Sequence, residues 1–131
     1  MTLQEVSVLI VDDVNSVRLQ IKELLKTFGF AKIHLFSNGA EAAAFAKTNE
    51  CHLILADWHM EPMNGLELLK QIRADEKTKG AAFVMITAES TKEGVIQAIQ
   101  AGVDDYLVKP MTLEQVQNKV FHIITKKKVL S

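Results

Sequence analysis

Cysteine, proline and aromatic residues are all scarce in this sequence of 131 residues. Cys51 is the only cysteine, which excludes a disulfide within the chain and a cluster of thiolate metal ligands, and favours a reducing compartment. We expect its thiol to be a small, partly buried apolar group. No apolar run approaches the roughly 20 residues that cross a membrane, and residues 1–5 lack the features of a signal peptide. We therefore expect a cytoplasmic protein with no membrane association.

An excess of either charge is also absent, because the formal net charge is -1 and charged residues make up 24% of the chain. This balance predicts no binding to nucleic acid, so any charged site must be local. The basic segment Lys126–Lys128 is interpreted as a solvated helix end, with an anionic partner as the less favoured alternative. The spacing of His34, His52 and His122 does not match a zinc site, and we expect surface or strand positions for them.

Short apolar runs alternate with amphipathic segments along the chain. This alternation favours a parallel sheet with right-handed crossovers and helices on both faces, which is a doubly wound α/β fold in a single domain over residues 1–131. The predicted strands are Val6–Val11, Lys32–Phe36, Leu53–Asp57, Ala82–Thr87 and Asp105–Val108. The predicted helices are Asn15–Phe28, Ala40–Thr48, a segment with its apolar face at Leu66, Leu69 and Ile72, Thr91–Ala101, and a last helix that starts at a Thr112–Gln115 capping box.

Acidic, hydroxyl and basic side chains stand where the predicted strands end. Asp12 and Asp13 follow the first strand, Asp57 ends the third, and Thr87 and Lys109 close the fourth and fifth. The carboxyl ends of parallel strands lie on one edge of the sheet, so these side chains should converge there. Three carboxylates at one place repel one another, and a divalent cation relieves this repulsion. Because the ligand atoms are all oxygens, Mg2+ is the expected cofactor.

A site of this kind is suited to a phosphoryl group. Phosphoryl transfer depends on in-line positioning and on neutralising the charge of the phosphoryl oxygens more than on proton transfer. Lys109 is the candidate ammonium group and Thr87 the candidate hydroxyl donor. Asp57 is then the carboxylate nucleophile that would become an aspartyl phosphate. Pro62 and Gly65 keep the chain irregular just beyond Asp57 and leave room above its carboxylate.

Five motifs in the order of the chain carry a resemblance to a known family. They are Asp12-Asp13, the segment Asp57–Met60, Thr87-Ala88, Tyr106, and Lys109-Pro110. Nearly the whole chain resembles a two-component response-regulator receiver domain, and within that family the single-domain chemotaxis proteins of the CheY type. The resemblance implies a flavodoxin/CheY-like sheet of five strands in the order 2-1-3-4-5, with five helices.

The resemblance also implies the role of each residue in the site. Asp57 would be the phosphoacceptor for a histidine kinase. Asp13, Asp57 and the backbone carbonyl of His59 would bind Mg2+ directly, with Asp12 acting largely through water. Lys109 would contact the phosphoryl group. The protein would not be an enzyme beyond catalysing its own phosphorylation and dephosphorylation.

A conformational switch is a further implication of the resemblance. Thr87 would move toward the phosphoryl group, and Tyr106 would turn inward behind it. The small side chain of Ala88 would leave access to that group. His59 and Glu89 occupy positions at which the family tunes the rate of dephosphorylation.

Two positions depart from the family pattern. The family usually has proline four residues after the phosphoacceptor, where this chain has Glu61 followed by Pro62, so the loop path and the charge near the metal can differ. The family usually has an acid before Gly65, where this chain has Asn64, and we expect a structural role for it. The family further implies a cis peptide bond before Pro110, which would direct the preceding lysine into the site.

An apolar pair on the fourth predicted helix indicates a partner surface. Ile96 and Ala98 already supply core positions, so Val95 and Ile99 are expected to be exposed, with a core role for one of this pair as an equal alternative. The expected surface consists of Val95, Ile99, Tyr106 and Lys119. The resemblance places target binding there, and the flagellar motor switch is the expected target because no output domain accompanies the receiver segment. A phosphatase is a further expected partner, and we expect a monomer.

Other functions stay open from the sequence alone. The chain could be a receiver from a longer regulator, or a phosphate sink or relay module that binds no motor protein. A small-molecule phosphohydrolase is less favoured, because His59 stands two residues beyond Asp57 where a second catalytic acid would be needed. A flavodoxin-like binder is less favoured still, because Asp12-Asp13 replace the Gly/Ser/Thr-rich phosphate loop that it requires.

Overall fold

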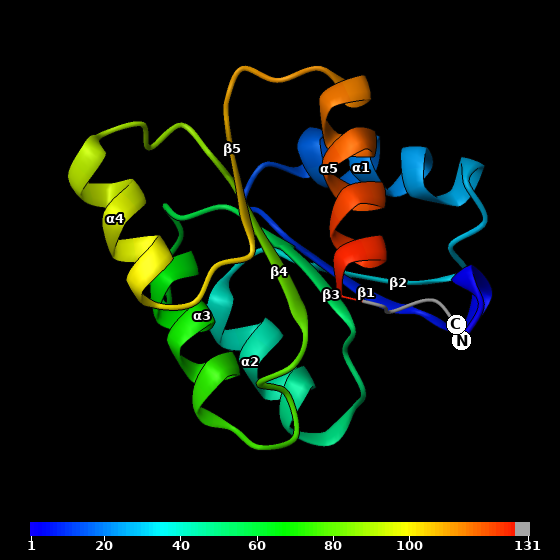
Figure 1. Cartoon of the computed structure of the whole chain (residues 1–131), viewed down its shortest axis with the longest axis horizontal. Helices are drawn as coiled ribbons and strands as arrows, with labels where there is room; N and C mark the ends of the chain where they lie inside the picture. Colours follow the sequence, from blue (N-terminus) through cyan, green and yellow to red (C-terminus); the bar gives the residue numbers. More distant parts are fainter. Residues whose placement is uncertain (128–131) are drawn as a thin grey trace.

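A parallel sheet forms the centre of the molecule (Figure 1). The computed structural model describes residues 1–127, in which five strands pair in the order β2-β1-β3-β4-β5. This confirms the doubly wound α/β fold and the strand order implied by the resemblance. The strands are β1 (Ser7–Val11), β2 (Lys32–Phe36), β3 (Leu53–Ala56), β4 (Ala82–Thr87) and β5 (Asp105–Val108).

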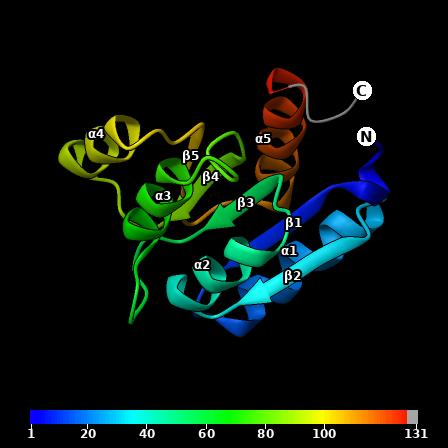
Figure 2. The same cartoon turned by 90° about the horizontal axis from the view of Figure 1, so that it is seen from below.

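Helices cover both faces of the sheet, as Figures 1 and 2 show. One face carries α1 (Asn15–Thr27) and α5 (Leu113–Lys126), and the other carries α2 (Gly39–Thr48), α3 (Gly65–Ala74) and α4 (Lys92–Gln100). A short 3-10 helix (Leu3–Glu5), which the sequence did not predict, precedes β1. None of the helices within residues 1–127 has both the length and the apolar character that crossing a bilayer requires.

Alternate residues of the inner strands supply the two halves of the core. In β1, Leu9 and Val11 face the layer of α2, α3 and α4, whereas Val8 and Ile10 face α1 and α5. Every residue of β1, β3 and β4 is buried, which explains why these strands have apolar runs in place of alternating patterns. The outer strands β2 and β5 are only partly buried.

For each strand and helix whose two ends were predicted, both ends agree with the structure to within one residue. β3 ends at Ala56, so Asp57 lies just beyond the strand. α2 begins at Gly39, one residue before its predicted start at Ala40. The Gly39 N–H donates to the carbonyl oxygen of Met63 at 2.9 Å, and a Cβ at Gly39 would lie 2.6 Å from that oxygen. Glycine is therefore required here because two loops approach each other closely.

Two helix starts show the predicted structural roles. Thr112 and Gln115 form the capping box of α5. Asn64 caps α3, because its side chain accepts a hydrogen bond from the Glu67 N–H at 2.8 Å. This contact gives Asn64 the structural role expected from the sequence.

The lone cysteine, three of the histidines and the C-terminal lysines were expected to have structural or surface roles, and the structure describes most of them. Cys51 is buried, and burial raises the pKa of its thiol to about 11. His34 and His52 are half-buried, and His122 is exposed on α5. In the segment Lys126–Lys128, Lys126 is the last residue of α5, and Lys128 lies outside the described residues.

Candidate functional site

Asp12 and Asp57 lie side by side because their strands are neighbours in the sheet. β1 pairs with β3 so that Val11 is opposite Ala56, and an aspartate follows each of these residues. The Asp57 N–H donates to the carbonyl of Val11 at 2.9 Å, which extends the sheet pairing to the site. Asp12 is 3% exposed and Asp57 is 8% exposed, whereas Asp13 faces solvent. The site therefore has two buried carboxylates and one at the surface.

These three carboxylates form one cluster. One oxygen atom from each of Asp12, Asp13 and Asp57 lies within 4.8 Å of the other two. Within residues 1–127, no other group of three or more histidine, cysteine or carboxylate side chains has ligand atoms this close. The topology thus brings together the acids that the sequence placed on one edge of the sheet.

Lys109 is the cation within this cluster. Its ammonium group donates to Asp12 Oδ2 at 2.7 Å and to Asp57 Oδ2 at 2.9 Å. Its backbone N–H donates to the carbonyl of Thr87 at 2.8 Å, which joins the ends of β4 and β5. The peptide bond between Lys109 and Pro110 is cis, as the resemblance implied. The ammonium group consequently bridges the two buried carboxylates.

Burial and ion pairing have opposite effects on the charges of the site. Burial raises the pKa of Asp12, although the hydrogen bond from Lys109 opposes this effect. Burial alone would lower the pKa of Lys109, but its hydrogen bonds to Asp12 and Asp57 outweigh burial and raise the pKa. Lys109 therefore stays charged, and one ammonium group among three carboxylates leaves an excess of negative charge.

Thr87 and Tyr106, the predicted switch residues, both contact the loop between β4 and α4. Thr87 is buried at the end of β4, and its Oγ1 accepts a hydrogen bond from the Glu89 N–H at 3.2 Å. The Tyr106 hydroxyl donates to the Glu89 carbonyl at 2.7 Å. Burial, together with the charges of Glu89 and Asp57, raises the pKa of Tyr106 to about 12, so its hydroxyl keeps its proton. Glu89 thus connects the two residues through its backbone.

His59 and Glu89 connect two loops near Asp57. His59 Nε2 lies 3.1 Å from Glu89 Oε1, and the Thr91 hydroxyl donates to Glu89 Oε2 at 2.6 Å. The hydrogen bond from Thr91, with a smaller contribution from His59, lowers the pKa of Glu89. The two residues that the resemblance associates with dephosphorylation are therefore in direct contact.

The backbone of Asp57 is held by the start of α3. The Trp58 N–H donates to Asp57 Oδ1 at 2.6 Å, and the Gly65 N–H donates to the Trp58 carbonyl at 2.8 Å. A Cβ at Gly65 would lie 2.1 Å from the carbonyl oxygen of Asp57, so only glycine allows this contact. This role of Gly65 was not predicted from the sequence, which indicated only that this glycine keeps the loop irregular.

A hollow of about 630 Å³ opens beside the carboxylate cluster. Its lining residues are Asp13, His59, Met60, Glu61, Pro62, Asn64 and Glu67. Glu61 and Pro62 are exposed and are joined by a cis peptide bond that the sequence did not predict. The departure from the family pattern therefore adds a carboxylate to the wall of this hollow.

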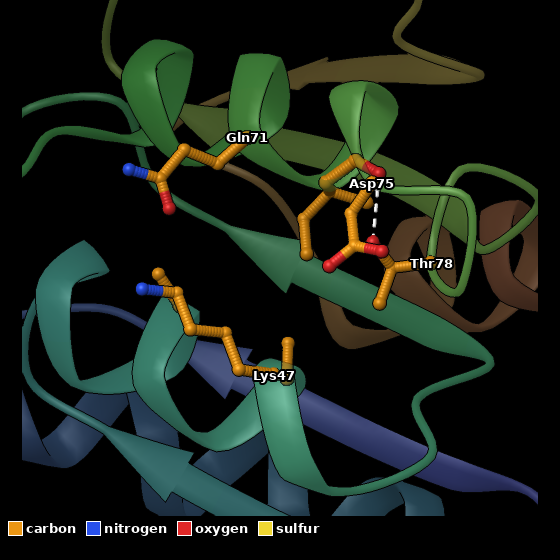
Figure 3. A pocket seen from close by; sticks show the side chains of 7 residues that line it. Lys47, Gln71, Asp75 and Thr78 are labelled. Carbon is orange, nitrogen blue, oxygen red and sulfur yellow. Dashed lines mark hydrogen bonds between the residues drawn. The ribbon is translucent and has the colours of Figure 1, made fainter.

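A second hollow, of about 30 Å³, lies between α2 and α3 (Figure 3). Lys47 on α2 lies across it from Gln71 on α3, and the Thr78 hydroxyl donates to a backbone carbonyl of α3 at 2.8 Å. The helices run antiparallel to the strands, so this hollow is at the opposite end of the sheet from Asp57. It has room for about one water molecule, which makes it unsuitable as a ligand site.

The predicted partner surface needs one correction. Ile96 was assigned to the core, but it is 42% exposed, and Ile99 is 62% exposed. Val95 is half-buried, and Ala98 is buried as predicted. The buried residues of α4 are Gly94 and Ala98, which lie four positions apart on one side of the helix. Ile96 lies midway between them in the sequence and so points away from the sheet.

Arg18 is a neighbour of the site that was not predicted from the sequence. Its guanidinium group donates to the backbone carbonyl of Asp12 and, at 3.0 Å, to the Asn15 side chain. The only signal in the sequence is its position in the second turn of the helix that follows the acids. That position does not distinguish a contact with the loop from exposure to solvent.

The donor atoms of the cluster fit Mg2+. All three side chains supply carboxylate oxygens, which are the ligands that Mg2+ prefers. The excess of negative charge around Asp12 and Asp57 is the kind that a divalent cation neutralises. Asp12, Asp13 and Asp57 are therefore the side chains that would hold the ion.

Comparisons with known proteins agree with this geometry. Residues 8–121 match the family described as response regulator receiver domain. CheY-3 of Vibrio cholerae serotype O1 is 39% identical over 89% of this chain and 90% of its own length, and CheY of Pseudomonas aeruginosa is 37% identical over 86% and 91%. Both are chemotaxis proteins.

A solved structure supports the same assignment. The receiver domain of the sensor histidine kinase PA1611 from Pseudomonas aeruginosa PAO1 has a magnesium ion coordinated in its active-site cleft. It superposes with a TM-score of 0.81 and 25% identity, covering 91% of this chain and 97% of that one. The fold, the acidic cluster at the ends of β1 and β3, and the extent of these matches show that the chain belongs to the response regulator receiver domain family, with CheY-like chemotaxis proteins among its relatives.

Proposed function

We propose that this chain is a phosphorylation-dependent switch in which Asp57 accepts a phosphoryl group from a histidine kinase. The observation that carries this proposal is the ammonium group of Lys109, which lies 2.9 Å from Asp57 Oδ2. A cation at this position neutralises charge that a phosphoryl group brings to the site. The hollow beside Asp13 and His59 gives a phosphodonor room to approach.

The transfer forms one bond and breaks one. A carboxylate oxygen of Asp57 attacks the phosphorus atom, and the bond from phosphorus to the imidazole nitrogen of the donor histidine breaks, with its electron pair going to that nitrogen. Lys109 then contacts a phosphoryl oxygen, and the Thr87 hydroxyl supplies a second donor. When bound by the three carboxylates and the His59 carbonyl, Mg2+ would neutralise the charge of the phosphoryl oxygens.

The loop between β4 and α4 would transmit the change. Thr87 Oγ1 now accepts from the Glu89 N–H, and a turn of this hydroxyl toward the phosphoryl group releases that hydrogen bond. Tyr106 is held by the carbonyl of the same residue, so the two side chains respond together. Phosphorylation favours the altered state only by as much as that state binds the phosphoryl group better.

The proposed output surface lies on α4, β5 and α5. Val95 and Ile99 supply its apolar part, Tyr106 lies on β5, and Lys119 on α5 is held by Asp105 at 2.9 Å. Because the relatives are chemotaxis proteins, the proposed target is a protein of the flagellar motor switch, and a phosphatase is the proposed second partner. We propose that residues 1–131 act as a single receiver domain, monomeric and cytoplasmic.

Intact-mass spectrometry after incubation with acetyl phosphate, with and without Mg2+, tests the phosphoacceptor. The native chain should gain one phosphoryl group only when Mg2+ is present, and Asp57→Asn should gain none. Asp75→Asn, which alters an exposed carboxylate at the end of α3, is the matched control and should react like the native chain. No gain in the native chain, or a gain that survives loss of Asp57, would overturn the proposal and leave a binding module that does not depend on phosphorylation.

Binding to a purified motor switch protein, measured with and without acetyl phosphate, tests the target. Phosphorylation should strengthen binding, and Ile99→Ser should weaken it. Leu19→Ser, which alters an exposed apolar residue on α1, should leave binding unchanged. Phosphorylation of Asp57 without any binding would overturn the motor target and favour a sink or relay module.

A further inference from the structure

The start of α1, directly after the acidic pair, is anchored differently from the starts of the other long helices. Its N-cap is Val14, whose side chain makes no capping hydrogen bond. Within residues 1–127, the other four α-helices are each capped by a side chain, from Asn38, Asn64, Thr91 and Thr112. An uncapped start leaves backbone N–H groups that another group must satisfy. At α1 this start is also the segment that carries Asp12 and Asp13.

Asp12 and Arg18 together provide the missing anchor. Asp12 Oδ1 accepts a hydrogen bond from the Val14 N–H at 2.9 Å. One arm of the Arg18 guanidinium group donates to the Asp12 carbonyl, and the other donates to Asn15 Oδ1 at 3.0 Å. The planar fork of arginine therefore clamps the loop to the first turn of α1 on both sides of Asp13.

Asp13 has no comparable restraint of its own. In the part of the chain that the structure describes, its carboxylate makes no hydrogen bond or ion pair, although it lies within 4.8 Å of Asp12 and Asp57 in the cluster. Its position therefore depends on the backbone between Asp12 and Val14. That backbone is what Arg18 holds.

We propose that Arg18 is a positioning residue for the divalent cation, because it holds Asp13 in place to act as a ligand. This inference rests on the proposed function, in which Mg2+ binds the acidic cluster. Groups that orient metal ligands typically change metal affinity by about tenfold or more when they are removed. A geometric role can be separated from a charge effect, because removing a nearby positive charge would by itself strengthen the binding of a cation.

Titration with Mg2+ tests the inference in three variants. Trp58 is the only tryptophan and is buried beside Asp57, so its fluorescence is suited to report binding, with calorimetry as an independent measurement. Arg18→Met should weaken Mg2+ binding by about tenfold. Arg18→Lys keeps the charge but not the fork and should have an intermediate affinity. Lys22→Met, which removes a charge one turn further along α1, should bind Mg2+ as tightly as the native chain or slightly more tightly.

A double-mutant cycle distinguishes positioning from a general loss of structure. If Arg18 acts through Asp13, then adding Arg18→Met to an Asp13→Asn chain should change Mg2+ affinity by less than about twofold. The free energy of unfolding in urea without Mg2+, measured for each variant, shows whether the fold is intact. If Arg18→Met does not fold, Arg18→Lys takes its place in the cycle.

The outcomes separate this inference from the proposed function. If the native chain binds Mg2+ and Arg18→Met binds it equally or more tightly, the positioning role is overturned, whereas the phosphoacceptor proposal stands. If Arg18→Met lowers Mg2+ affinity equally in the native and Asp13→Asn chains, the positioning role is overturned as well. If the native chain binds no Mg2+, the proposed metal site and this inference fail together.

Discussion

Replacing Gly65 with alanine should damage both stability and the phosphoacceptor site. The new Cβ would lie 2.1 Å from the carbonyl oxygen of Asp57 and 3.0 Å from Trp58 Cα. Both neighbours are backbone atoms, which cannot rotate away as the end of a side chain can. Ordinary contact begins at 3.4 Å, so either α3 or the backbone of Asp57 must move by about 1.3 Å.

The expected cost follows from three contributions. Overpacking of this kind costs about 1–3 kcal/mol. The movement also breaks the hydrogen bond from the Gly65 N–H to the Trp58 carbonyl, which contributes about 1 kcal/mol. Alanine recovers about 1 kcal/mol at most through its better helix propensity. We therefore expect the free energy of unfolding to fall by about 2 kcal/mol.

Urea unfolding of Gly65→Ala and Gly80→Ala provides the measurement and its matched control. A Cβ at Gly80 would meet no atom within 4 Å, so Gly80→Ala should stay within about 1 kcal/mol of the native chain. The folded Gly65→Ala protein should also accept a phosphoryl group from acetyl phosphate more slowly, because Asp57 is displaced. Equal stability and equal rates in the two variants would refute the argument that Gly65 holds Asp57 in place.

Two further predictions concern groups away from the site. Arg73 pairs with Asp104 at 2.8 Å and both side chains are mostly buried, so Arg73→Met should lower the free energy of unfolding by about 3 kcal/mol. Lys79→Met breaks an exposed ion pair and should lower it by less than about 1 kcal/mol. Similar losses for the two variants in urea unfolding would contradict this prediction. The thiol of Cys51 should react slowly with Ellman's reagent near about pH 8, because burial disfavours the thiolate. The reaction should become faster as the pH rises toward the pKa of about 11. Fast reaction of the folded chain near neutral pH would contradict this prediction.

The strands, helices and residue types of the site could be predicted because each depends on local sequence. The apolar runs that end at Asp12 and Asp57 mark buried parallel strands, and parallel strands place their carboxyl ends on one edge. Oxygen ligands and one ammonium group at that edge indicate phosphoryl chemistry with Mg2+. The order of the strands came from the resemblance to the family, since an apolar run does not specify which neighbour it pairs with.

The tertiary structure alone decided which segments far apart in the chain touch. The sequence marked Gly65 as a break, but only the fold shows that Gly39 and Gly65 are both needed, because a loop approaches the backbone of each too closely to admit a Cβ. The rotation of α4 about its axis exposes Ile96 because packing on the sheet selects Gly94 and Ala98 as the contact side. Arg18 contacts the acidic loop because it lies one full helical turn after Val14, where its side chain reaches back to the Asp12 carbonyl. Local sequence thus determines the elements and the chemistry available at their ends, whereas packing determines the side-chain contacts, because they depend on how the elements are rotated and spaced in three dimensions.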